Sequence, residues 1–425
     1  MRQYLIKAFS VLSSKTATDT YILFSGNLLS AFTGFVFTLL AARALSVSDF
    51  GIFSAANNLM YILISLSDIG ISAGLVHFVA GLESEGKPEE SLKYIKAAFL
   101  LRFTFITLIC LPLFLFPAFF SAKFMASDYR QLSYWVGTLA IFFMFYSLLP
   151  YIFQAKRKFI LSVMVDNSLG VIRLLFSVMF LILGGLTLTK LLLSILVSTL
   201  GPILIGITFL GLGFLYVSLN RQIIKKLLKF SGWLGVNNII SALTGRLDVQ
   251  MLAVIMGATA TGIYSIPIRL STFIVVLTGS FSAVLAPRYA SFDDKAKEKR
   301  YLKKASMFLI PMIAGILVWI VFAKPFILLL FGEKYSESVT VFRYLAFATI
   351  PFLTTAPAVA AIIYAMKKTI YIGLFSIPQI SLLFIFNLVF IPRFGVVGPA
   401  ITLFIVNSIL AVYVWSIVIK YYRLI

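Results

Sequence analysis

The sequence predicts an all-α, multi-pass membrane protein with about 12 transmembrane helices in two related six-helix lobes. Of the 425 residues, 61% are hydrophobic and 12% are charged, whereas a soluble domain is about 45–50% apolar and about 25% charged. Apolar stretches recur along the chain, each near the roughly 20 residues that a helix needs to cross the hydrocarbon. Short sequence features also recur at a fixed spacing, which indicates a duplicated unit.

Charged or Gly/Pro-rich segments divide the chain into twelve apolar stretches. Residues 1–19 combine basic and apolar side chains and predict a short interfacial helix. The first stretch is about 24 residues long, which exceeds the roughly 7–15 apolar residues of a cleaved signal, so we expect it to be retained. The expected spans are Tyr21–Ala44, Gly51–Phe78, Tyr94–Phe120, Gln131–Phe153, Phe159–Leu183, Leu191–Leu215, Phe230–Met256, Gly262–Pro287, Lys304–Phe331, Val339–Met366, Ile370–Ile391 and Val396–Tyr421.

The distribution of Lys and Arg predicts the orientation of these spans. With the N-terminus inside, 24 of them fall in cytoplasmic segments and 8 in outer segments. Cytoplasmic loops are enriched in Lys and Arg, so both termini are predicted to be cytoplasmic. This excess fits anionic membrane lipid as a partner, and not nucleic acid. The segment Ser218–Lys229 has apolar and lysine-rich faces and predicts an amphipathic linker on the lipid headgroups.

An internal repeat with an offset of 211 residues divides the chain in two. An even number of spans per copy makes a parallel repeat, with a pseudo-two-fold axis along the membrane normal and a cavity between the copies. We therefore predict lobes at residues 1–219 (spans 1–6) and 220–425 (spans 7–12). The matching pairs are Gly51-Ile52-Phe53-Ser54 with Gly262-Ile263-Tyr264-Ser265, Lys123-Phe124 with Lys334-Tyr335, and Lys156-Arg157 with Lys367-Lys368.

Apart from the charges assigned to the loop sides of the membrane, such as Arg43, the predicted spans hold seven charged residues. An ionised side chain at mid-bilayer costs at least about 2.5–3.5 kcal/mol, so such residues normally face a cavity or a partner. One interpretation is a cavity with a net positive lining that binds a phosphate or diphosphate, for which the planar guanidinium is suited. The alternative is that the acids pair with the arginines and hold helices together. The seven are Asp68, Arg102, Asp166, Arg173, Arg246, Asp248 and Arg269.

Spacing along the helices limits how these charges can pair. Asp166 and Arg173 are seven residues apart and share one helix face. Arg246 and Asp248 are two residues apart, so one of them must face elsewhere.

The sequence excludes most catalytic and metal chemistry. One His and one Cys cannot build a His/Cys metal site, a disulfide framework or a CxxC pair. Cys110 is expected to be a small buried apolar residue and His77 an interfacial one. There is no GxxxxGK[ST] loop for ATP and no hydrolase motif. The predicted outer loops are too short to form a catalytic domain. We therefore expect no catalytic residues, metal or cofactor, and a membrane-embedded glycan enzyme is disfavoured.

Several stretches resemble the polysaccharide-export flippases of the multidrug/oligosaccharidyl-lipid/polysaccharide superfamily. In the first half they are residues 42–53, Ala-Arg-Ala-Leu-Ser-Val-Ser-Asp-Phe-Gly-Ile-Phe, and Asp68-Ile69-Gly70-Ile71-Ser72. In the second half they are Arg246-Leu247-Asp248, then Gly262-Ile263-Tyr264-Ser265 with Arg269, and Pro287 at the end of span 8.

The resemblance implies a MATE-like, V-shaped transporter of twelve helices that works by alternating access in the bacterial cytoplasmic (inner) membrane. For the Wzx-type subfamily it implies an undecaprenyl-diphosphate oligosaccharide repeat unit as substrate, flipped outward for assembly of O-antigen, capsule or exopolysaccharide. Polysaccharide polymerase machinery is then an expected partner. Twelve spans instead of fourteen argue against the lipid II flippase branch.

These inferences assign roles to the seven charges. Arg102, Arg173, Arg246 and Arg269 are expected to bind the substrate head, and Asp68, Asp166 and Asp248 to act in pairing or in coupling to a proton or sodium gradient. The alternative is a cation-coupled multidrug exporter of the same fold. Such exporters commonly carry an acidic site in span 1, but this span has Arg43 as its one charged residue.

Overall fold

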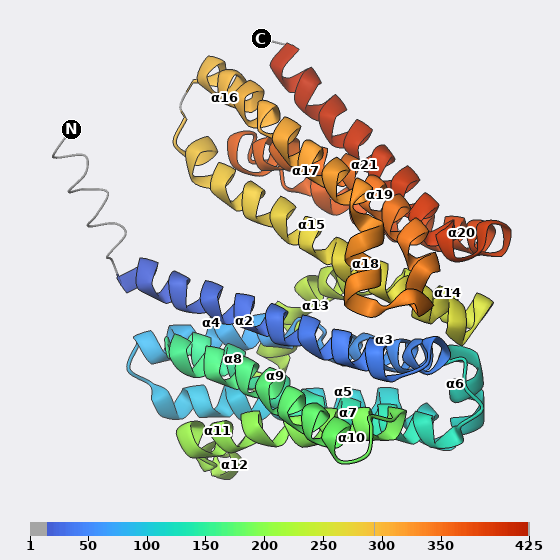
Figure 1. The fold of residues 1–425 in the computed structure, drawn as a ribbon. Coiled ribbons are helices and arrows are strands. Elements are labelled where there is room, and N and C mark those ends of the chain that lie inside the picture. Colours follow the sequence, from blue (N-terminus) through green and yellow to red (C-terminus); the bar gives the residue numbers. More distant parts are fainter. Residues whose placement is uncertain (1–14, 293, 424–425) are drawn as a thin grey trace. The chain divides into compact units, whose positions relative to one another are not determined.

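The structure is a computed structural model that describes residues 15–292 and 294–423, and every regular element within these ranges is helical (Figure 1). The predicted interfacial helix over residues 1–19 lies mostly outside the described residues. The helices are α2 Lys15–Ala44, α3 Val47–Asp68, α4 Ile71–Ser84, α5 Pro88–Leu115, α6 Pro117–Phe124, α7 Arg130–Ser147, α8 Leu149–Ala155, α9 Phe159–Ile182, α10 Leu188–Ser198, α11 Leu200–Leu210, α12 Gly213–Tyr216, α13 Arg221–Thr244, α14 Leu247–Met256, α15 Ala258–Ala290, α16 Lys295–Met307, α17 Leu309–Val321, α18 Ala323–Phe331, η1 Glu333–Tyr335, α19 Ser336–Ala360, η2 Ala361–Ala365, α20 Ile370–Phe394, η3 Gly395–Val397 and α21 Gly398–Arg423.

The described helices confirm about twelve membrane spans. Ten helical stretches are long and apolar enough to cross a membrane, and the bent pair Gly235–Thr244 and Leu247–Met256 adds an eleventh. One of the ten, Ile370–Tyr422, has 53 residues, which at 1.5 Å per residue would measure roughly 80 Å against about 30 Å of hydrocarbon. It contains α20 and α21, which pack against each other on either side of Gly395, whose φ is 60°. Counted separately, these two helices bring the number to twelve.

The chain forms two compact units. The first contains residues 1–45, 59–121 and 129–239, and the second contains residues 46–58, 122–128 and 240–425. Helices α3, α6 and α13 therefore each contribute residues to both units. The lobe boundary between residues 219 and 220 stays a prediction.

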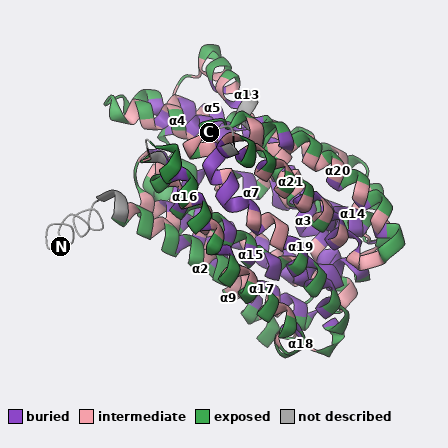
Figure 2. Ribbon diagram, turned by 90° about the horizontal axis from the view of Figure 1, so that it is seen from above, coloured by how far each residue is buried: buried purple, intermediate pink, exposed green. Residues whose placement is uncertain are grey.

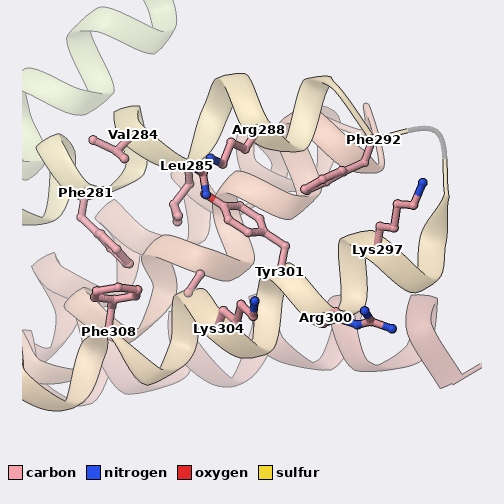
Figure 3. A pocket seen from close by; sticks show the side chains of 11 residues that line it. Phe281, Val284, Leu285, Arg288, Phe292, Lys297, Arg300, Tyr301, Lys304 and Phe308 are labelled. Carbon is pink, nitrogen blue, oxygen red and sulfur yellow. The ribbon is translucent and has the colours of Figure 1, made fainter. Parts of the chain in front are cut away.

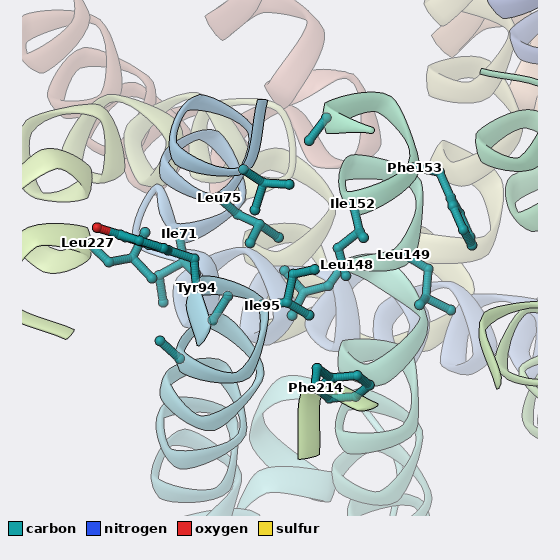
Figure 4. Close-up of a cluster of buried hydrophobic side chains, with 14 of the residues drawn as sticks. Ile71, Leu75, Tyr94, Ile95, Leu148, Leu149, Ile152, Phe153, Phe214 and Leu227 are labelled. Atoms are coloured by element: carbon teal, nitrogen blue, oxygen red, sulfur yellow. The ribbon is translucent and has the colours of Figure 1, made fainter. Parts of the chain in front are cut away.

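The first unit is held together around α4, α5 and α8. Buried side chains of these helices form one apolar cluster, to which Leu227 of α13 and Phe214 of α12 also belong (Figure 4). Beside it, α2 packs along α9 and α5 packs along α7. The cluster includes Ile71, Leu75, Tyr94, Ile95, Leu148, Leu149, Ile152 and Phe153.

Predicted span 2, Gly51–Phe78, is not one helix, which corrects the sequence-based expectation. Helix α3 ends at Asp68 and α4 begins at Ile71, because Ile69 and Gly70 have φ values of 39° and 74°. A Cβ at Gly70 would lie 2.6 Å from the carbonyl oxygen of Ser231 in α13. Glycine is needed here both for its positive φ and for this close approach of backbones. Hydropathy cannot detect such a break because both pieces are apolar.

The second unit is organised around α19, which packs against both α15 and α21. Within the stretch Glu333–Ala365, 61% of an 18-residue apolar segment is buried. The corresponding value for the stretch Lys295–Val321 is 17%. Figure 2 shows the same difference between α19 and the outer helix α17. Exposed apolar side chains such as Leu329 and Val412, both more than 70% exposed, are the surface expected of a chain in lipid.

Helices α3 and α15 meet at equivalent positions of the internal repeat. A Cβ at Gly51 would overlap the carbonyl oxygen of Ala258, and a Cβ at Gly262 would overlap that of Val47. The two glycines are 211 residues apart, and so are Val47 and Ala258. A contact in which each side presents the same positions is the mark of a two-fold axis. Small residues at such crossings let membrane helices approach closely.

The bounds of α13 differ from the predicted linker and from predicted span 7. The predicted linker Ser218–Lys229 and the first half of predicted span 7 (Phe230–Met256) form one helix, Arg221–Thr244. The chain then bends by 49° before α14 begins at Leu247. The charged segment between predicted spans 8 and 9 is largely helical, because α15 continues to Ala290 and α16 starts at Lys295.

Candidate functional site

A polar cavity of about 430 Å³ lies in the second unit. It is surrounded by four helical segments. These are the part of α3 that belongs to the second unit, the end of α13, the start of α14 and the middle of α15. It brings together two of the four arginines predicted to bind substrate, Arg246 and Arg269. The lining residues are Ser54, Asn57, Asn58, Ser241, Ala242, Gly245, Arg246, Val249, Ser265, Ile268, Arg269 and Thr272.

The break between α13 and α14 places Arg246 in this cavity. Arg246 has φ −135° and ψ −8° and forms the N-cap of α14. Its carbonyl oxygen accepts a 3.0 Å hydrogen bond from Nδ2 of Asn58, which also donates to Oε1 of Gln250 at 3.2 Å. Gln250 in turn donates to the carbonyl oxygen of Phe124 at 2.6 Å. A helix break at membrane depth is tolerated where side chains satisfy the backbone in this way.

Asp248 faces away from the cavity. Its Oδ2 accepts a 2.6 Å hydrogen bond from the hydroxyl of Tyr264, and its Oδ1 accepts one of 2.7 Å from the backbone N–H of Val249. The side chain is buried. Of these two charges, Arg246 lines the cavity and Asp248 does not.

Two walls of the cavity come from equivalent positions of the repeat. Helix α3 supplies residues 54, 57 and 58, and α15 supplies the residues 211 positions later in each case. The pairs are Ser54 with Ser265, Asn57 with Ile268, and Asn58 with Arg269.

In the first unit, Asp68 and Arg102 form an ion pair. Nη1 of Arg102 lies 3.5 Å from Oδ1 of Asp68, and the arginine is 2% exposed. Ser72 donates its hydroxyl to the same carboxylate oxygen at 2.6 Å, so Asp68 also ties α3 to α4 across their break. For this pair the geometry matches the helix-holding alternative. An arginine so enclosed needs its partner, because leaving one buried charge alone is costly.

The two charges of α9 contact aromatic side chains. The guanidinium of Arg173 lies 4.2 Å from the ring centroid of Phe37 in α2, a cation–π contact, and Tyr61 is a further polar partner. Asp166 accepts a 3.4 Å hydrogen bond from the hydroxyl of Tyr146. These contacts connect α9 to α2, α3 and α7 within the first unit.

Uncharged polar side chains, which were not among the predicted site residues, line the cavity or hold the ionised groups. Asn57, Asn58 and Gln250 line or support the cavity, and Tyr146 and Tyr264 bond the carboxylates. Two adjacent asparagines inside an apolar stretch were a usable signal, because buried amides need partners. In the described ranges, no group of three or more His, Cys, Asp or Glu side chains is placed to hold a metal.

The cavity has the chemistry of an anion site with polar surroundings. Guanidinium groups bind phosphate oxygens in a bidentate manner and stay charged when dehydrated. Amides and hydroxyls beside them can bond sugar hydroxyls or further oxygens.

Comparisons with known proteins agree with this architecture. Residues 16–293 match the family described as "Polysaccharide biosynthesis protein". A Shigella flexneri protein named "Putative O-antigen transporter" is 27% identical over 186 residues. That match spans 42% of this chain and 43% of the relative, less than half of either.

Solved structures share the fold. The lipid II flippase MurJ in an inward closed conformation superposes with a TM-score of 0.73 at 15% identity, covering 94% of this chain and 87% of MurJ. An inward-facing multidrug resistance MATE family transporter gives 0.72 at 14% identity, covering 92% and 95%. Together with the match of residues 16–293, these results establish that the chain is a multi-pass membrane protein with a MATE-like transporter fold that belongs to the polysaccharide biosynthesis protein family.

Proposed function

We propose that the protein is a Wzx-type flippase that moves a polyprenyl-diphosphate-linked oligosaccharide, with undecaprenyl as the prenyl group, from the inner to the outer leaflet of the bacterial cytoplasmic membrane. Alternating access exposes the cavity to each side in turn. The product serves the assembly of O-antigen, capsule or exopolysaccharide, with a polymerase as the next partner. The family match and the name of the Shigella flexneri relative support this proposal.

The observation that carries the proposal is that Arg246 and Arg269 line the same cavity, together with amides and hydroxyls. A diphosphate supplies the negative charge for the arginines, and a sugar supplies hydroxyls for Asn57 and Asn58. A cavity for organic cations would need acids or aromatic faces at these positions. In the first unit, Arg102 is engaged by Asp68, while Arg173 is the cation we propose to contact substrate at another stage of transport.

We further propose that a proton or sodium gradient drives the cycle. Asp166 is the proposed coupling group in the first unit, because its single described hydrogen bond, from Tyr146, is long at 3.4 Å. Asp248 is held by a shorter bond and by the backbone, so we assign it a positioning role. Asp68 keeps its pairing role with Arg102.

The test is translocation of a labelled undecaprenyl-diphosphate oligosaccharide in proteoliposomes, with and without proton and sodium gradients. Arg246→Ala and Arg269→Ala should each lower the initial rate by about 10-fold or more, the loss expected when a charged hydrogen-bonding group is removed. Arg393→Ala is the matched control, because Arg393 is an exposed arginine of the same unit outside the cavity.

The outcomes separate the two functions. Loss of flipping in both cavity variants, with normal rates in the control, supports the flippase. Equal rates in all variants would remove the cavity from the mechanism. Gradient-driven uptake of organic cations without flipping of any polyprenyl-linked glycan would instead identify a multidrug exporter.

A further inference from the structure

A second cavity, of about 660 Å³, lies in the second unit where α15 ends and α16 and α17 begin (Figure 3). It shares no lining residue with the cavity of Arg246 and Arg269. Its cations are Arg288, Lys297, Arg300 and Lys304, and its apolar wall includes Phe281, Val284, Leu285 and Phe308.

The two walls are helix faces. Phe281, Leu285 and Arg288 recur at intervals of four and three residues on α15, so they occupy one face. Lys297, Arg300 and Lys304 recur at intervals of three and four on α16 and do the same. Figure 3 shows Phe281 and Phe308 at one end of the cavity and Lys297 and Arg300 at the other. The cavity is therefore amphiphilic along its length.

Aromatic packing fixes the corner between the two helices. Tyr301 contacts the rings of Tyr289 and Phe292, with centroids 5.0 and 5.4 Å apart. The guanidinium of Arg288 lies 5.9 Å from the centroid of Tyr301. These contacts link α15 to α16 beside the cavity.

Two acids of the described residues near the cavity, Glu298 and Asp294, bond other groups. Glu298, on the buried face of α16, accepts a 3.0 Å hydrogen bond from the hydroxyl of Tyr422 in α21. Asp294 caps α16 by accepting from the backbone N–H of Ala296 at 2.9 Å. The described residues that line the cavity include four cations and no acid. In its apolar wall, Val284 and Phe308 are 70% and 65% exposed.

We propose that this cavity binds one anionic diacyl phospholipid, with its phosphate at Lys297, Arg300 and Lys304 and an acyl chain along Phe281, Val284 and Phe308. Charge complementarity selects an anionic head, and the adjoining exposed apolar wall requires a hydrocarbon tail. A soluble anion would leave that wall uncovered. The site is independent of the transported substrate, because it needs only the membrane in which the protein resides.

The experiment measures lipids retained by the purified protein in detergent, by native mass spectrometry and by the shift of thermal unfolding. The probes are phosphatidylglycerol, phosphatidylcholine of the same chains, inorganic phosphate and undecaprenyl diphosphate. Wild type should retain one phosphatidylglycerol at least 10-fold better than phosphatidylcholine. The triple variant K297Q/R300Q/K304Q should lose about 100-fold in affinity, at roughly fivefold per cation near a lipid surface.

The matched control is K295Q/K299Q/K303Q, which removes the same charge from the same helix but from positions outside the cavity. Two of these lysines contact α21, since Lys299 donates to the carbonyl oxygen of Tyr422 and Lys295 lies over Tyr421. Retention of phosphatidylglycerol by this control supports the site. Equal loss of phosphatidylglycerol binding in both triple variants would mean that only the total charge of α16 matters, and it would overturn the proposed site.

Two further outcomes would also overturn the proposal. Inorganic phosphate that displaces the lipid or stabilises the protein equally well would make this a free-anion site. Undecaprenyl diphosphate retained in preference to phosphatidylglycerol would make it a substrate-approach site.

Discussion

At the scale of residues, tyrosine hydroxyls hold two of the intramembrane carboxylates. Tyr264 donates to Asp248 at 2.6 Å and Tyr146 donates to Asp166 at 3.4 Å. The first pair is buried on both sides, whereas Asp166 is half-buried. When a buried acceptor loses its hydrogen-bond donor, the folded state is destabilised by the desolvation penalty of the acceptor. This penalty is larger for a more deeply buried group.

Tyr264→Phe should therefore lower the free energy of unfolding by about 1–3 kcal/mol, because it leaves Oδ2 of Asp248 without its hydroxyl donor. Thermal unfolding in detergent measures this. Tyr146→Phe is the matched control and should cost less, since it removes a longer bond at a more open site. The reverse order of the two effects would contradict this account of Asp248.

Outside the membrane spans, Glu83 links α4 to Lys156 after α8. Burial opposes ionisation of Glu83, but hydrogen bonds from Lys156 and Ser91 and the charges of Lys156 and Lys158 outweigh it and hold its pKa below the ordinary value of 4.5. A lowered pKa means that the folded state favours the ionised form, so this stabilisation is present above pH 4.5 and is lost as pH falls through the folded value.

Glu83→Gln should lower the unfolding temperature at pH 7, by an amount equivalent to less than about 1 kcal/mol for this partly exposed pair. The difference from wild type should shrink as pH falls below 4.5. Unfolding measured between pH 7 and pH 3.5 tests this. A difference that stays constant over that range would show that the ion pair does not contribute.

The charged residues could be predicted from the sequence, but their partners could not. Arg246 and Arg269 were identifiable because charge inside an apolar span is costly and rare. Arg102 is enclosed with Asp68, whereas Arg246 lines a cavity. This difference depends on which helices touch and on where α13 ends. Neither fact is visible in hydropathy or spacing.

At the scale of elements, the close crossing of α3 and α15 depends on Gly51 and Gly262. Gly51→Ala or Gly262→Ala places a methyl group against a backbone carbonyl that cannot move aside as a side chain would. Each should destabilise the protein by about 1–3 kcal/mol, the usual cost of overpacking. The unfolding temperature in detergent measures the effect.

Gly279→Ala is the control for this pair of variants. It lies in α15, and a Cβ there would meet nothing within 4 Å. Because alanine favours a helix over glycine by about 0.5–1 kcal/mol, this variant should be neutral or slightly more stable. Equal losses at all three positions would mean that the crossing is not the cause.

Helix breaks were the part of the fold that sequence reasoning missed. Ile69-Gly70 and Gly245-Arg246 interrupt stretches that are apolar on both sides, so a count of apolar residues joins the pieces. The number of spans was predictable because charges and turns end each one. Breaks inside a span are fixed by contacts such as that of Gly70 with Ser231, which link distant parts of the sequence.

At the scale of the whole molecule, the orientation in the membrane stays a prediction from the Lys and Arg distribution. Cys110 is the single cysteine and is fully buried, so introduced cysteines can be labelled over a low background. Lys87→Cys should react with a membrane-impermeant maleimide only after the cytoplasmic side is opened. Lys190→Cys should react with the same reagent in intact spheroplasts. The opposite pattern would invert the orientation of both termini.

The reciprocal contact of α3 and α15 also bears on how a ligand would lie in the cavity. A two-fold pair of walls would present the same groups on both sides, but positions 58 and 269 hold an amide and a guanidinium, and positions 57 and 268 hold an amide and an apolar side chain. The two walls are therefore chemically different: the α15 wall carries a cation and the α3 wall carries uncharged amides. We therefore expect the proposed substrate to take a single orientation in this cavity, with its anion toward Arg269 of α15 and its uncharged hydroxyls toward Asn57 and Asn58 of α3.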